Sequence, residues 1–178
     1  MAIGAFGIVN RLVFIVVMIV MGLNQGMQPI AGYNFGAKLY GRVNKVLRLT
    51  IIYATVVTTF GFLVGMLVPD LVVGIFTSDA ELTELSVTGL RITVMFFPII
   101  GFQMVTSNFF QSIGMAGKAI FLSLTRQMLI LLPCLLVLPQ FFGVAGVWYS
   151  MPVSDLLASL IALVMLVCQF RKFRTSPL

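Results

Sequence analysis

The sequence predicts an all-α polytopic membrane protein, a bundle of about five transmembrane helices. The chain has 178 residues, of which 60% are hydrophobic and only 9% are charged, whereas soluble domains carry roughly 25% charged residues. Five apolar stretches are each long enough to cross a hydrocarbon core, which takes about 20 residues as a helix. Most of the charged residues lie in the short segments between these stretches.

The five predicted spans follow one another without a linker or a low-complexity segment. In chain order they are 3–37, 49–68, 87–112, 119–138 and 144–170. Pro69 ends the second span and Pro139 ends the fourth, because proline lacks a backbone N–H and its ring obstructs the preceding helical turn. We therefore expect residues 1–178 to form a single transmembrane bundle.

The segments between the spans alternate in charge. Basic residues follow the first, third and fifth spans: Lys38, Arg42, Lys45, Arg48, Lys118, Arg171, Lys172 and Arg174. Acidic residues follow the second: Asp70, Asp79, Glu81 and Glu84. Cytoplasmic loops are enriched in Lys and Arg, so the C-terminus is expected in the cytoplasm. With five spans, the N-terminus then lies outside, directly before a span, and we expect the chain to be the C-terminal part of something longer.

The composition disfavours several other functions. The net charge of +6 could suggest nucleic-acid binding, but the basic residues lie in loops between spans and form no single solvated face. The chain has no histidine, and Cys134 and Cys168 lie far apart in apolar runs, without a metal-binding or redox pair. No phosphate-cradling GxxxxGK[ST] loop is present. We expect no cofactor, no metal and no catalytic residue.

The most informative stretch is residues 25–38. It reads Gln25-Gly26-x-Gln28-Pro29-Ile30-x-Gly32-Tyr33-Asn34-x-Gly36-Ala37-Lys38, with Arg42-Val43 after it. It resembles the signature of the MATE (multidrug and toxic compound extrusion) efflux transporters, in particular their multidrug-export, MepA-type branch. The resemblance continues through Gly114-x-x-Gly117-Lys118, Arg126-Gln127, Pro133 and Gly146-Val147-Trp148.

The resemblance implies a fold and a function. The chain would correspond to helices eight to twelve, in the second six-helix lobe of a MATE-like transporter of the MOP superfamily, and would lack the N-terminal lobe and helix seven. The implied function is efflux of an organic cation or drug in exchange for H+ or Na+, by alternating access in the inner (plasma) membrane of a bacterium; no enzyme activity is implied. The family's coupling carboxylates lie mainly in the first lobe, and residues 92–111, where some members carry an acidic residue, contain none. This chain alone is therefore not expected to transport.

Polar side chains inside two spans are the first candidates for a transport cavity. They are Gln25, Gln28 and Asn34 on the first span and Gln103, Asn108 and Gln111 on the third. Two interpretations stay open, hydrogen bonding between helices and the lining of a water-filled cavity. Pro29, between Gly26 and Gly32, is interpreted as a hinge, because proline bends a helix axis.

Asp155 is the only carboxylate inside a predicted span, and a charge at membrane depth needs a partner or a wet cavity. At 1.5 Å per residue, it lies roughly 16 Å below the outer end of its span. Arg126 lies roughly 12 Å above the inner end of the preceding span, in a core about 30 Å thick. Their depths agree, so we predict an ion pair. Its role is either structural or that of a gating or proton-responsive group.

Two other functions remain as alternatives. A lipid-linked oligosaccharide flippase of the same superfamily would share the helix arrangement, but its cavity should be rich in Arg and Lys. Here only Arg11, Arg91 and Arg126 are available for such a cavity. A non-transporting membrane scaffold would need neither the carboxamides nor Asp155.

Overall fold

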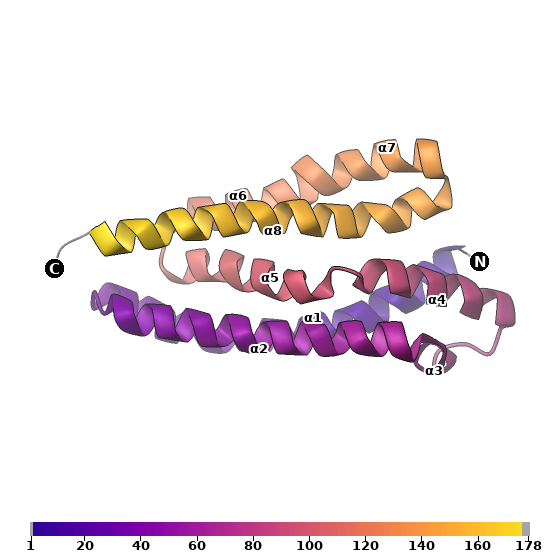
Figure 1. Cartoon of the computed structure of the whole chain (residues 1–178), viewed down its shortest axis with the longest axis horizontal. Coiled ribbons are helices and arrows are strands. Elements are labelled where there is room, and N and C mark those ends of the chain that lie inside the picture. The colour runs from indigo at the N-terminus through magenta and orange to yellow at the C-terminus, as the bar shows by residue number, and fades with distance from the viewer. Residues whose placement is uncertain (1, 176–178) are drawn as a thin grey trace.

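The computed structural model describes residues 2–175, with side chains described for 2–171. The predictions that rest on the side chains of Lys172 and Arg174 lie outside that part. The helices form an elongated bundle whose two ends carry the two ends of the chain (Figure 1). In order they are α1 (Ala2–Gly36), α2 (Tyr40–Leu67), α3 (Pro69–Gly74), α4 (Ala80–Val94), α5 (Phe97–Ser112), α6 (Ala116–Leu124), the π-helix η1 (Thr125–Leu131), α7 (Leu132–Phe142) and α8 (Val144–Thr175).

The all-α polytopic fold class is confirmed. Within the described residues, four continuous helical stretches are long and apolar enough to cross a membrane: Ala2–Gly36, Tyr40–Leu67, Ala116–Phe142 and Val144–Arg171. Helices α4 and α5 together make a fifth candidate span. Helix ends do not mark the edges of the bilayer core, so the predicted span limits stay predictions. Helix α2, for example, begins at Tyr40 and carries the basic residues that precede the predicted span 49–68.

The third span, predicted over 87–112, is broken close to Pro98, a proline at which a kink is possible. Helices α4 and α5 meet at an angle of 54°, and the break falls at Met95 and Phe96. Pro98 occupies the first turn of α5. Because Pro98 has no N–H to give to the carbonyl of Val94, an unbroken α-helix cannot run through this position with all its hydrogen bonds.

Pro139 does not end the helix at the predicted edge of the fourth span. Helix α7 continues to Phe142, and Pro139 lies inside it. The turn comes instead at Gly143, with φ of 57°, a conformation that glycine adopts without strain. A Cβ at Gly146 would lie 2.4 Å from the backbone of Leu138, so only glycine lets α7 and α8 meet this closely at the corner.

Helix α5 lies at the centre of the bundle. Figure 1 shows it between the α1–α2 pair and the layer formed by α6, α7 and α8. Phe109 and Phe110 of α5 are fully buried in the larger hydrophobic cluster, while Trp148 anchors a second cluster near the start of α1. Large apolar side chains elsewhere point outward, such as Phe60 with 68% of its surface exposed. Outward-facing apolar side chains are expected in a membrane protein, because the hydrocarbon tails of the lipids surround the helices in place of water.

Candidate functional site

The strongest candidate site is a pocket beside α5 that combines charged, polar and apolar groups. It has a volume of about 190 Å³ and takes its walls from α1, α4, α5, η1 and α8. We call it the polar pocket. Its lining residues are Asn10, Val13, Val17, Thr93, Phe97, Ile100, Met104, Arg126, Leu131, Met151, Ser154 and Asp155.

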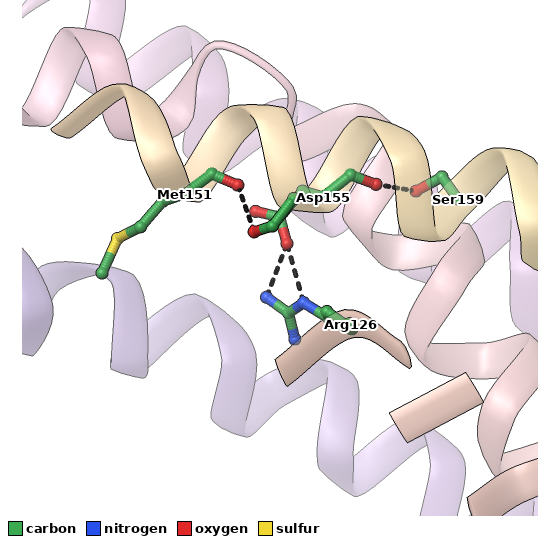
Figure 2. Close-up of polar contacts among 5 residues, drawn as sticks. Arg126, Met151, Asp155 and Ser159 are labelled. Carbon is green, nitrogen blue, oxygen red and sulfur yellow. Dashed lines mark hydrogen bonds and ion pairs between the residues drawn. The ribbon is translucent and has the colours of Figure 1, made fainter. Parts of the chain in front are cut away.

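The Arg126–Asp155 ion pair forms one wall of the polar pocket, and its formation confirms the pairing predicted from depth. Arg126 Nε donates to Asp155 Oδ1 at 2.8 Å, and Arg126 Nη2 lies 2.7 Å from the same oxygen. Figure 2 shows Arg126 reaching from its own helix to the carboxylate on α8. Both contacts use Oδ1, so Oδ2 takes part in neither.

The two partners differ in burial. The side chain of Asp155 is 7% exposed, whereas that of Arg126 is 33% exposed. The backbone around the carboxylate is itself well bonded, since Ser159 Oγ donates to the carbonyl of Asp155 at 2.6 Å. Arg126 is therefore the accessible half of the pair, and Asp155 depends on it for charge compensation.

The π-helix η1 places Arg126 in this wall. The N–H of Leu132 donates to the carbonyl of Gln127, the five-residue step of a π turn. Pro133 follows directly and lies in the first turn of α7. Its ring would clash with the carbonyl of Leu129 in a regular α-helix, and a wider turn relieves that clash. Proline thus explains why the helix widens over Thr125–Leu131, the segment that carries Arg126.

The predicted carboxamides divide into two groups. Gln28 Nε2 donates to Asn108 Oδ1 at 3.3 Å, which joins α1 to α5. One turn further along α1, a Cβ at Gly32 would lie 2.9 Å from the carbonyl oxygen of Ser112, so the two helices approach closely here. Asn108 Nδ2 also donates to the carbonyl of Met104. For this pair the structure contains the interhelical hydrogen bond that sequence analysis left as one of two interpretations.

The other candidates lie apart from the polar pocket. Gln103 is buried on α5, whereas Gln25, Pro29 and Gln111 are exposed. Asn34 is buried, and its Nδ2 donates to the carbonyl of Ile30 in its own helix. None of these five residues lines the polar pocket, and their proposed contact with a transport cavity stays a prediction.

Sequence reasoning missed several polar residues. Asn10, Thr93 and Ser154 line the polar pocket, yet each lies within two residues of a charged residue that drew attention instead. The Oγ of Thr125, next to Arg126, and both polar side-chain atoms of Asn24 are buried without a hydrogen-bond partner in the described part of the chain. A lone Asn in the apolar run 12–24 could have been singled out, because a buried amide in a bilayer is costly without a partner.

The sequence is similar to that of known membrane transporters. The family model described as MatE matches residues 1–136. The multidrug export protein MepA of Staphylococcus aureus (strain MSSA476) is 28% identical over 162 residues, which cover 91% of this chain and 36% of that protein. MepA of Staphylococcus saprophyticus is 25% identical over the same shares of both chains.

Solved structures show the same likeness. The MATE multidrug transporter DinF-BH is 37% identical, with a TM-score of 0.87 over 96% of this chain and 38% of that one. An outward-facing multidrug resistance MATE transporter of the MOP superfamily is 18% identical, with a TM-score of 0.89 over 97% of this chain and 39% of the other. At 18% identity the second likeness concerns the fold.

Proposed function

This chain belongs to the MatE family, and on that premise we propose that it supplies the second lobe of a secondary active transporter that exports organic, often cationic compounds. It spans about 36% of the length of the MepA relatives it matches. The complete transport cycle is accordingly proposed for an assembly in which an N-terminal lobe faces this one. Export would be driven by the inward movement of H+ or Na+.

The observation that carries this proposal is the concentration of polar groups along one side of α5, inside helices long enough to span a membrane. The Gln28–Asn108 bond links α5 to α1, and the Arg126–Asp155 pair lies on the polar pocket between α1, η1 and α8. Unsatisfied polar groups are costly in hydrocarbon, so a helix that served only as an anchor would have no use for them. We propose that they line the path of the exported compound.

Within this path, we assign the Arg126–Asp155 pair a structural role in the cavity wall. It fixes the π-helix against α8 and so fixes the shape of the polar pocket. Residues 92–111 of this chain contain no carboxylate. The coupling ion is therefore proposed to bind mainly in the other lobe, and this chain would complete the cavity.

Alternating access is proposed to occur by rocking of this lobe against the other. Two places in this chain can absorb such a movement. The break between α4 and α5 already lets the third span bend by 54°. Pro29 removes the N–H that would bond to the carbonyl of Gln25, which lowers the cost of bending α1 there.

The orientation follows from charge. We propose that the basic segment that begins at Lys38 lies in the cytoplasm, together with the C-terminus, in the plasma membrane of a bacterium. The acidic segment from Asp70 to Glu84 then lies outside. This arrangement leaves Asp155 near mid-depth of the bilayer.

An export assay with separated lobes tests the proposal. Cells that make this chain alone should accumulate ethidium like cells without it, whereas cells that make it joined to the part of MepA that precedes the matched region, the N-terminal lobe and helix seven, should accumulate less. In the joined protein, the double variant Gln28→Leu, Asn108→Leu should reduce export, while Val164→Leu on the exposed side of α8 serves as the matched control. Full export by the 178-residue chain alone, or none by the joined protein, would contradict the proposal.

A further inference from the structure

We propose that a second, apolar cleft binds a membrane phospholipid, with one acyl chain inside the cleft and the lipid phosphate on Arg11. The cleft lies between α1, α2, α3 and α4 and has a volume of about 430 Å³. Every residue that lines it is apolar or glycine, so it offers nothing to a polar ligand. The cleft and the polar pocket share Val13 and Phe97 as wall residues, and lipid binding in the cleft does not depend on the direction of transport.

The register of α1 and α2 sets the depth of this cleft. A Cβ at Gly61 would lie 2.9 Å from the side chain of Val16, so these two residues face each other in antiparallel helices. Counting from that contact, Arg48 on α2 lies level with Pro29 on α1. Arg11 and Arg48 are then roughly 27 Å apart along the bundle, at 1.5 Å per residue. That distance approaches the thickness of a hydrocarbon core, about 30 Å, and it puts the two arginines at opposite edges of the core.

The cleft begins beside Arg11 and descends into the core. Leu12 and Ile19 mark the extent of its lining on α1, a length of roughly 10 Å at 1.5 Å per residue. Arg11 lies one helical turn from Ile15, which also lines the cleft. A lipid whose phosphate lies at the membrane edge would extend its acyl chain in the same direction, from the interface toward the middle of the bilayer.

Arg11 has the chemistry of a phosphate ligand. It is exposed, and in the described part of the chain no carboxylate lies within ion-pair distance of its guanidinium group. A guanidinium group binds phosphate oxygens with two parallel N–H donors. Because phosphate is the anion that every phospholipid presents at this depth, the charge at the mouth of the cleft matches the proposed occupant.

The lining suits an acyl chain, because every wall residue is apolar or glycine and the cleft has a volume of about 430 Å³. The rim opens outward, since Ile15 is 55% exposed, Phe60 is 68% exposed and Ile75 is 73% exposed. An apolar cleft left empty in a bilayer would lose dispersion contacts along its whole wall, and a lipid chain restores them.

Counting bound lipids tests this inference. The 178-residue chain is purified in dodecyl maltoside and titrated with palmitoyl-oleoyl phosphatidylglycerol, and native mass spectrometry measures the number bound and their Kd. Arg11→Gln should weaken the tightest phospholipid site roughly tenfold or more, because a hydrogen bond to a charged group is lost. Diacylglycerol with the same chains, which lacks the phosphate, should bind the wild type and Arg11→Gln equally.

Two further variants complete the design. Val64→Phe, which fills the cleft, should remove one bound phospholipid, whereas Arg42→Gln at the other end of the bundle and Val164→Phe on exposed α8 should change nothing. Arg11 is exposed, so its substitution leaves packing intact and gives an answer even where Val64→Phe impairs folding. Equal phospholipid binding by wild type and Arg11→Gln would overturn the inference. A dimer that Val64→Phe abolishes would also overturn it, by assigning the cleft to a second copy of the chain.

Discussion

The unequal burial of the Arg126–Asp155 pair predicts unequal effects when either partner is removed. Arg126→Gln leaves a carboxylate whose side chain is only 7% exposed, and an uncompensated buried charge costs about 3–5 kcal/mol. Asp155→Asn leaves a guanidinium that is 33% exposed and borders the polar pocket. It can turn toward the pocket, so we expect only the loss of its charged hydrogen bonds, about 1.5–3 kcal/mol.

The assay is thermal unfolding of the purified variants in one detergent. A chain of this size shifts its midpoint by about 2–4 °C per kcal/mol, so Arg126→Gln should unfold roughly 3–8 °C below Asp155→Asn. The double variant should recover much of the loss, because no charge is left unpaired. Arg91→Gln and Asp70→Asn remove the same charges at exposed positions and should shift stability by less than about 0.5 kcal/mol.

Other outcomes would refute this reasoning. If Asp155→Asn is the more destabilising change, the burial argument is wrong. If both single variants are as stable as the wild type, the pair contributes nothing to the fold. If Asp155→Asn folds normally but abolishes pH-dependent export in the joined protein, and Arg126→Gln does not rescue it, Asp155 belongs to the coupling machinery and not to the cavity wall.

Three further predictions concern orientation, bending and packing. In a cysteine-free background, Ser78→Cys should react with an impermeant thiol reagent added outside intact cells; labelling of Asn44→Cys instead would reverse the proposed orientation. Pro29→Ala should slow export by the joined protein with little change in drug binding, because it restores a hydrogen bond at the proposed hinge; unchanged turnover would reduce Pro29 to a packing residue. Gly89→Ala places a Cβ 2.5 Å from the ring of Trp148, so it should destabilise the chain by about 1–3 kcal/mol in thermal unfolding, and a wild-type midpoint would show that the ring moves freely.

The helical class and the ion pair could be predicted because they depend on fixed lengths. A helix rises 1.5 Å per residue and a bilayer core is about 30 Å thick, so residue numbers alone gave comparable depths for Arg126 and Asp155. The 2.7 Å contact between them follows from that agreement and from the cost of leaving either charge alone in the membrane. Gln28 and Asn108 were recognised for a related reason, since amides in apolar runs need partners.

Proline marks where a helix can depart from regular geometry, but the form that the departure takes could not be predicted from the sequence. Pro98 lies at the start of a new helix after a break, Pro133 follows a π turn, and Pro139 lies within a continuing helix. Proline has a different effect on the helix at each of these three positions. Each proline leaves one backbone carbonyl without its helical N–H donor, and the neighbouring helices determine whether another group can donate to that carbonyl. Asn10 was missed because the other walls of the polar pocket come from α4, α5, η1 and α8, and the order of residues along the chain does not show which helices lie side by side.

The dependence of export on an ion gradient tests the central claim most directly. The protein that joins the N-terminal lobe and helix seven of MepA to this chain would be reconstituted in liposomes, and ethidium transport measured with and without an imposed proton or sodium gradient. If this chain is part of a secondary active exporter, transport should require one of the two gradients and should stop when this chain is omitted. Equal rates with and without both gradients, or equal rates without this chain, would contradict the account.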